Sequence, residues 1–245
     1  MWSSDFEIAP GELFGEWLYK EIAANAHIEQ NGFMPDRVRA VAARLQDDRP
    51  AAERYVAIVP WLDSFYAFTG PGKYVYFGRR LLERCPHEDS VAFVVAHEIA
   101  HHDLGHLNYF AGPLARRMAS LSAGALAVLF FRTLLRRVYS PEQEMAADYR
   151  AVDLCIRAGY HPDKFLYLFH VLELIFLDYG DLKGVFGLDT ESDQELSPEA
   201  SLVTKARVWL YQRERGYLPI QDRLAAIKEY CAWRHGFGEI HLRGA

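Results

Sequence analysis

Two histidines and a glutamate in the middle of an apolar stretch have the types and spacing needed to hold and use a metal ion. His97, Glu98 and His101 form the pattern His-Glu-x-x-His inside VAFVVAHEIAHHDLGHL. If this stretch is helical, residues four apart lie on one face, so both imidazoles can reach one cation at about 2.0–2.1 Å. Glu98 is offset around the helix, where its carboxylate can take a proton from a water molecule near the metal. This pattern predicts zinc-assisted hydrolysis.

A second pair of histidines with the same spacing follows directly. His102 and His106 are also four residues apart, with Asp103 beside them. The shorter side chain of Asp103 is a poorer general base from that position, so the first pair is favoured and the second is the alternative. A further alternative is a helix whose histidines are ordinary core or surface residues. The apolar surroundings weigh against it, because burying unpartnered imidazoles and a carboxylate is costly.

A third ligand is expected downstream, because a catalytic zinc has three protein ligands and one open position. The segment SPEQEMAAD begins with Ser140 and Pro141, which are typical of a helix N-cap and the first helical residue. Glu144 and Asp148 then share one helix face in apolar surroundings. We therefore predict one Zn²⁺ per chain, held by His97, His101 and Glu144. Asp148 is predicted to orient a ligating imidazole without touching the metal.

The two segments together resemble a known family. HEIAHHDLGH followed by SPEQEMAADYRAVDLCIRAGYHP is similar to the zinc peptidase family of the HtpX heat-shock protease and the CAAX prenyl protease. The positions that match the family's motifs are His97, Glu98, His101, His106, Glu144, Ala147, Asp148 and 158–162. Upstream, Ala67-Phe68 and KYVYFGRRLLERC resemble the family's strand and following helix, so the likeness covers residues 55 to 225. It implies a gluzincin type of catalytic domain.

Two positions depart from the family pattern. Where the family commonly has an Asn before the Ala-Phe pair, this chain has Tyr66. The family also commonly has a Thr-His-Pro sequence shortly before an arginine, and here Tyr217 replaces that histidine upstream of Arg223. In the family this histidine lies near the metal, and a phenol can donate the same hydrogen bond. The resemblance thus implies that Tyr217 and Arg223 help to stabilise the oxyanion; the alternative for Tyr217 is an ordinary loop tyrosine.

The surrounding pattern predicts an α+β fold that is mostly helical, in a single domain over 1–245. We expect N-terminal helices over 1–50, a catalytic core over 54–178, and a C-terminal loop and helices over 179–245. Two short β-branched and aromatic runs, 54–59 and 73–77, are separated by the turn sequence TGPG. They predict a hairpin or a small antiparallel sheet that precedes the histidine helix.

Composition argues against several classes of protein, among them nucleic-acid-binding and disulfide-rich secreted proteins. The net charge of -6 argues against a nucleic-acid-binding surface, which needs a concentrated basic face. The three cysteines, Cys85, Cys155 and Cys231, show no CxxC spacing, so neither a disulfide framework nor a cysteine zinc site is expected. Free cysteines suit a reducing compartment, and the N-terminal segment does not have the pattern of a secretory signal. These features favour a cytoplasmic protein.

One segment requires a membrane test. Residues 118–131 (MASLSAGALAVLFF) are uncharged and bounded by arginines. A helix of this length spans roughly 21 Å, against about 30 Å of hydrocarbon, so a buried core helix is the favoured interpretation. The flanking arginines keep an interfacial helix, and therefore peripheral membrane contact, as the alternative.

Taken together, these features predict a metalloendopeptidase that acts on peptides or unfolded proteins. An extended substrate is expected to add as a strand to an exposed edge near 66–76. The alternative is a zinc-binding protein that is inactive or self-capped, which the tyrosine at 217 and the acidic segment 181–199 would support. The sequence does not predict an oligomeric state.

Overall fold

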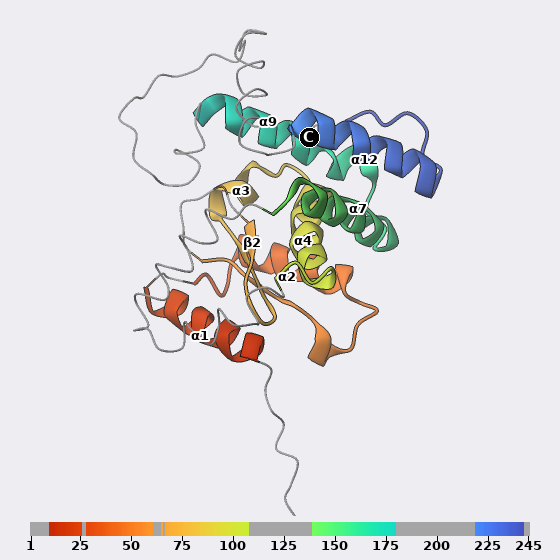
Figure 1. Ribbon diagram of the computed structural model, residues 1–245. Helices are drawn as coiled ribbons and strands as arrows, with labels where there is room; N and C mark the ends of the chain where they lie inside the picture. Colours follow the sequence, from red (N-terminus) through yellow and green to blue (C-terminus); the bar gives the residue numbers. More distant parts are fainter. Residues whose placement is uncertain are drawn as a thin grey trace, which may run out of the picture.

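The computed structural model describes residues 10–25, 28–60, 65, 67–107, 139–179 and 219–242. Its longer helices are α1 (Pro10–Asn25), α2 (Phe33–Leu45), α4 (Glu88–Asp103), α7 (Pro141–Arg157), α9 (Tyr167–Tyr179) and α12 (Ile220–His235) (Figure 1). Short elements are η1 (Ala51–Glu53), β1 (Val56–Ile58), β2 (Ala67–Thr69), β3 (Tyr74–Phe77), α3 (Arg79–Arg84) and α8 (Pro162–Phe165). The mostly helical α+β fold class predicted from the sequence is confirmed. The segments 118–131 and 181–199 and the residues Tyr66 and Tyr217 lie outside the described ranges.

The sheet has three strands in the order β1-β3-β2. β2 runs antiparallel to β3, with Thr69 opposite Val75, and the two form a hairpin. β1 runs parallel to β3, with Val56 opposite Tyr74. The predicted small sheet is therefore present but mixed, because the two runs at 54–59 and 73–77 pair in parallel. A third strand, β2, lies between these two runs in the chain and forms the hairpin with β3. β1 therefore pairs with the other edge of β3, in the parallel direction.

The two faces of the sheet contact different helices. Along β3, Val75 belongs to the main hydrophobic core together with residues of α2 and α4. The next residue, Tyr76, points the other way and packs with Leu18 and Ile22 of α1 in a second cluster. α1 lies against the hairpin so closely that a Cβ atom at Gly15 would be 2.1 Å from the carbonyl oxygen of Pro71. Only glycine fits at this crossing.

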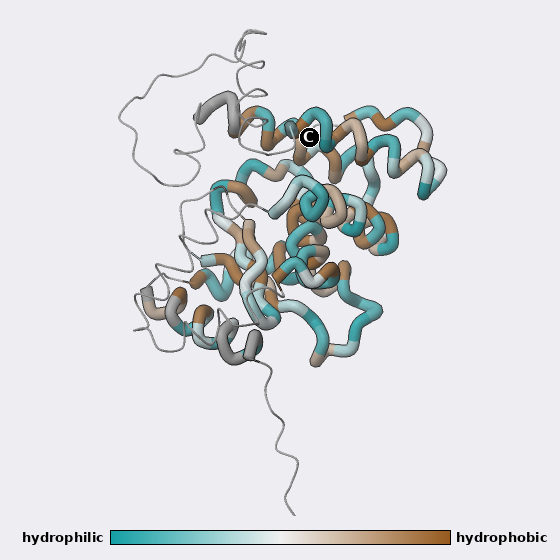
Figure 2. The backbone as a smooth tube through the Cα atoms, viewed as in Figure 1, coloured by the Kyte–Doolittle hydropathy of each residue, from teal (hydrophilic) through white to brown (hydrophobic). Residues whose placement is uncertain are grey.

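α4 is the central helix of the main core. It is buried along most of its length, from Ser90 to His101, and is apolar on nearly all sides, which is typical of a helix surrounded by other elements. α2, α7 and strand β2 pack around it, while α9 and α12 lie together on the side of the molecule far from α1 (Figure 1). On α7 and α12, hydrophobic and hydrophilic residues alternate along the tube, as expected for helices with one buried face (Figure 2).

Polar contacts anchor both ends of α4. At its first turn, Glu88 accepts a hydrogen bond of 3.2 Å from the Tyr160 hydroxyl, and Asp89 accepts one of 3.1 Å from the backbone N–H of His161. At its last turn, the Asp103 carboxylate pairs with Arg49 at 2.6 Å and with Arg150 of α7 at 3.1 Å. His97 thus lies between two anchored ends, and His101 lies in the last turn, next to the contacts of Asp103.

Candidate metal centre

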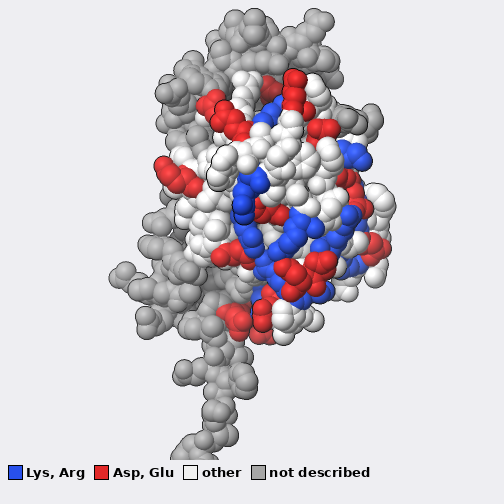
Figure 3. All heavy atoms as spheres, turned by 90° about the vertical axis from the view of Figure 1, so that its right-hand side faces the viewer, with Lys and Arg blue, Asp and Glu red and all other residues white. Residues whose placement is uncertain are grey.

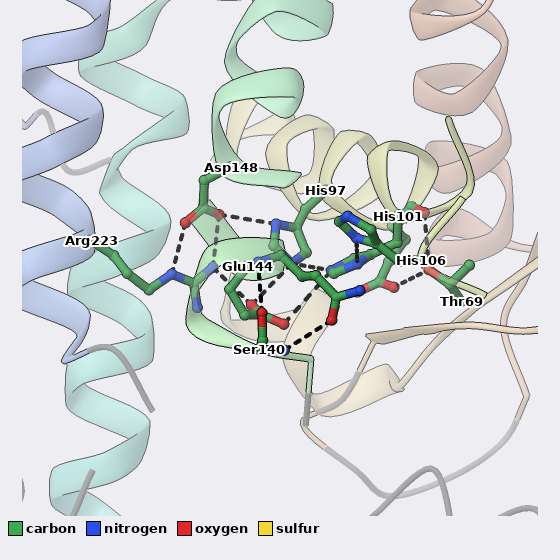
Figure 4. Close-up of polar contacts among 10 residues, drawn as sticks. Thr69, His97, His101, His106, Ser140, Glu144, Asp148 and Arg223 are labelled. Atoms are coloured by element: carbon green, nitrogen blue, oxygen red, sulfur yellow. Dashed lines mark hydrogen bonds and ion pairs between the residues drawn. The ribbon is translucent and has the colours of Figure 1, made fainter. Parts of the chain in front are cut away.

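α4 places His97 and His101 on one face, one turn apart. Their Nε2 atoms are 3.1 Å apart, and the two rings meet nearly edge to face, at an interplanar angle of 80°. His101 is almost completely buried and His97 is 14% exposed. Both imidazoles therefore present a ring nitrogen to the same point beside the helix (Figure 4).

α7 brings Glu144 to that point. The helix begins as predicted, with Ser140 as the N-cap, Pro141 in the first turn and a capping box in which Ser140 and Gln143 satisfy each other's backbone N–H groups. Ala147 is fully buried where α7 packs on α4, and its small side chain lets the two helices approach closely. Glu144, one turn into the helix, faces the histidines.

The separations between these three side chains suit a single metal ion. Two atoms bound to one tetrahedral zinc at about 2.0–2.1 Å lie roughly 3.3–3.4 Å apart. Here Nε2 of His97 is 3.1 Å from Nε2 of His101 and 3.5 Å from Oε2 of Glu144. Nε2 of His101 is 3.7 Å from Oε1 of Glu144. Among the described residues, His97, His101 and Glu144 form a group whose ligand atoms all lie within 4.8 Å of one another. The donor set and its spacing therefore fit zinc.

Asp148 contacts the opposite side of the His97 ring. Its Oδ1 lies 3.0 Å from Nδ1 of His97, close enough for an ion pair, although the ring N–H is not well aligned with that oxygen. The contact leaves Nε2 of His97 as the nitrogen that faces Glu144. Asp148 is fully buried and is not one of the three residues whose ligand atoms converge.

Arg223 of α12 holds the carboxylates of α7. Its guanidinium forms two hydrogen bonds to Asp148, of 2.8 and 2.7 Å, and lies 3.3 Å from Oε2 of Glu144 (Figure 4). Burial alone would lower the pKa of Arg223, but these carboxylates outweigh it and raise the pKa. The structure thus brings Arg223 to the site, with its donors directed at the carboxylates.

The site favours one positive charge. Burial by itself lowers the pKa of His97, but the carboxylates of Asp148 and Glu144 outweigh this and raise it to about 10. Burial and the charge of His97 lower the pKa of its neighbour His101. Burial raises the pKa of Glu144, but the contact with His97 and the charge of Arg223 together have the larger effect, so the pKa of Glu144 is lowered. A proton, or a metal cation in its place, is stabilised between these groups.

Two further side chains fix the ring of His101. Nδ1 of His106 lies 2.8 Å from Nδ1 of His101, on the side away from Glu144. The ring of Tyr139, next to the cap residue of α7, is stacked on the His101 ring with a centroid separation of 3.7 Å. The His106 contact occupies Nδ1 and leaves Nε2 free for a metal. His106 could be identified from its position in a motif, whereas no sequence pattern indicates the stacking by Tyr139.

Glu98 lies beside the ligands and is 6% exposed. Its Oε2 is 2.6 Å from the hydroxyl of Thr69 in β2. Burial raises the pKa of Glu98, an effect that the charge of His97 and the Thr69 hydrogen bond oppose. Thr69 is not predicted by the sequence, because a threonine at the end of a strand belongs to no metal or catalytic motif.

His102 and His106, the alternative pair of metal ligands, do not face a common point. His102 stacks on Tyr55 with a centroid separation of 4.3 Å, and its Nε2 lies 3.3 Å from the backbone oxygen of Tyr74. Asp103 is engaged by two arginines at the end of α4. His106, by contrast, faces His101. His102 and His106 thus serve packing and orientation, and the described residues that converge as metal ligands belong to the first pair.

Comparison with known proteins agrees with this geometry. Residues 30–229 match the family model described as peptidase family M48. The chain belongs to peptidase family M48. This is the family of HtpX and the CAAX prenyl protease, as the motifs indicated, and an M48 chain is a metallopeptidase by family. No curated protein matches this M48 chain.

Within the described ranges of this M48 chain, no helix has both the length and the apolar character that crossing a bilayer requires. The segment 118–131, on which the interfacial alternative depends, lies outside those ranges.

Proposed function

We propose that this M48 protein is a zinc-dependent endopeptidase in which Glu98 is the general base. One observation carries the proposal: ligand atoms of His97, His101 and Glu144 converge on one point at separations that suit zinc. Glu98 follows His97 on the same buried helix, where its carboxylate can serve a water molecule beside the metal. The family supports hydrolysis of peptide bonds as the reaction.

The roles of the protein groups follow from their positions. When bound, zinc supplies a Lewis acid that polarises the substrate carbonyl and lowers the pKa of a water molecule. Glu98 takes the proton of the attacking water and passes it to the leaving amine. Asp148 and His106 keep the two imidazoles turned toward Glu144, and Arg223 holds Asp148 in place. The roles of Arg223 and Tyr217 at the oxyanion remain predictions.

The sheet offers a place for an extended substrate. In the strand order of the described sheet, β1-β3-β2, β2 is an edge strand that pairs with β3 on one side. Thr69 at the end of β2 contacts Glu98, so this strand ends beside the residue that we propose as the general base. We therefore assign β2 as the strand to which a peptide or an unfolded protein adds through backbone hydrogen bonds. Such binding gives low side-chain selectivity.

Glu98→Gln tests the reaction. Zinc-loaded wild type is expected to cleave an unfolded protein such as casein, and the variant is expected to keep its zinc while activity falls by roughly 10²–10⁴-fold. Glu83→Gln on α3 makes the same chemical change at a surface ion pair with Arg79 and is the matched control. If Glu98→Gln cleaves as fast as the control, Glu98 is not the base.

The alternative is a zinc-binding protein that is inactive or self-capped, which the tyrosine at 217 in place of the family histidine would support. The same assay separates the two functions. One zinc per chain without any cleavage of unfolded protein would support the inactive form, and chelator-sensitive cleavage would exclude it.

Partners other than a peptide substrate remain predictions. On the face shown in Figure 3, acidic and basic side chains are interspersed. The prediction that nucleic acid is not a partner rests on the net charge of -6. Peripheral membrane contact through 118–131 is tested by co-sedimentation with liposomes that contain anionic lipid. Protein that stays in the supernatant at low ionic strength would exclude it.

A further inference from the structure

The hydroxyl of Thr69 joins the hairpin to the predicted general base. Thr69 is the last residue of β2 and is completely buried. Its Oγ1 lies 2.6 Å from Oε2 of Glu98 and 2.9 Å from the backbone oxygen of the same residue. Its backbone faces Val75 of β3 in the hairpin. The side chain of Thr69 therefore links the carboxylate of Glu98 to the sheet.

The Thr69 hydroxyl has two acceptors of Glu98 within reach but only one hydrogen to donate. The carboxylate oxygen, at 2.6 Å, is nearer than the backbone oxygen, at 2.9 Å. The shorter contact therefore assigns the hydrogen to the carboxylate. A glutamate side chain is otherwise free to adopt several rotamers, so the contact selects one of them.

We propose that Thr69 is a positioning residue for Glu98. Its hydroxyl holds Oε2 and leaves Oε1 as the oxygen that receives the proton of the attacking water. This inference rests on the proposed function of Glu98. Because Thr69 ends the strand to which the substrate adds, it also fixes the base relative to the substrate backbone.

Two substitutions separate the effect of the Thr69 hydroxyl from the effect of the side chain's shape. Thr69→Val keeps the branched shape and removes the hydroxyl, while Thr69→Ser keeps the hydroxyl. Ser90→Ala is the matched control, because Ser90 is also a buried hydroxyl of this core, on α4, and donates to the backbone oxygen of Lys164 away from the site. Zinc per chain, kcat and KM on an unstructured peptide are measured for all four proteins.

Thr69→Val is expected to keep its zinc and its KM while kcat falls by about 10–100-fold, because small displacements of a catalytic group cost about that much. Thr69→Ser and Ser90→Ala are expected to stay within about 3-fold of wild type, since positioning is retained. A wild-type kcat in Thr69→Val would overturn the proposal. So would an equal fall in Thr69→Ser, which would indicate packing by the methyl group.

Crystal structures provide a readout that does not depend on turnover. In the wild type, Oε2 of Glu98 is expected at hydrogen-bond distance from Thr69, and in Thr69→Val the carboxylate is expected to move. If it does not move, the proposal is wrong, whether or not the protein has activity. Wild-type protein that cleaves no peptide would refute the proposed function instead. If Thr69→Val does not fold, Thr69→Ala is tested in the same way.

Discussion

In the metal-free protein, we expect His97 to stay protonated well above the pH at which a histidine normally loses its proton. Asp148 and Glu144 overcome the effect of burial and raise its pKa to about 10. At pH 8 about 99% of the molecules would then carry this proton, against about 3% for a histidine with the ordinary pKa of about 6.5. Because the folded state binds the proton more tightly than the unfolded state, the stabilisation is full below about pH 6.5. It is lost as the pH rises through about 10.

Zinc must displace this proton in order to bind Nε2 of His97. Between pH 7 and 9 the apparent zinc affinity is therefore expected to rise by roughly tenfold per pH unit, or about 100-fold in total. Asp148→Asn removes the largest of the contacts that raise the pKa. We expect this variant to lose the proton of His97 at lower pH and to show a weaker pH dependence of zinc affinity.

The assay is a pH titration of the metal-free protein by NMR, with ¹⁵N-labelled histidines. The chain has 10 histidines, so the His97 signals are assigned by comparison with His97→Ala. Zinc affinity is then measured by competition with a chelator at pH 7, 8 and 9. A neutral His97 ring at pH 8 in wild-type protein would refute the reasoning. Equal titration curves for wild type and Asp148→Asn would show that Asp148 is not the cause.

Three other outcomes follow from the same contacts. Glu144→Ala should abolish stoichiometric zinc in elemental analysis, whereas Glu142→Ala, exposed on the same turn, should retain it; equal zinc content would reassign the third ligand. Arg223→Met should lower the free energy of unfolding in urea by about 3–5 kcal/mol, because buried Asp148 loses both hydrogen bonds from the guanidinium; an unchanged midpoint would contradict this. Gly15→Ala should cost about 1–3 kcal/mol in the same assay, since its Cβ would be 2.1 Å from a backbone oxygen of the hairpin turn. A wild-type stability for this variant would mean that α1 can move away.

The part of the site that rests on helix periodicity could be predicted from sequence. Spacing four residues apart determines which side chains share a helix face, so His97 can be paired with His101, and Glu144 with Asp148, from their positions in the chain alone. The cap at Ser140 has a local cause, a side-chain contact with the backbone three residues on, and it was also predicted correctly.

The parts that depend on strand pairing could not be predicted. The two runs at 54–59 and 73–77 have the composition of strands, but composition does not say whether neighbours run parallel or antiparallel. The intervening strand β2 has only three residues and carries no alternating pattern. Thr69 could not be singled out for the same reason, since its importance arises only when that strand packs against α4.

The anchoring of α4 at both ends has a consequence for how the metal is acquired. The contacts of Glu88 and Asp89 at one end, and of Asp103 at the other, involve none of the expected ligands. The helix is thus held in register by groups that remain when the cation leaves. The ligands stay preorganised in the empty protein, unlike those of a zinc finger, whose chain folds only around its metal. Loading and exchange of the ion can then take place on an already folded chain.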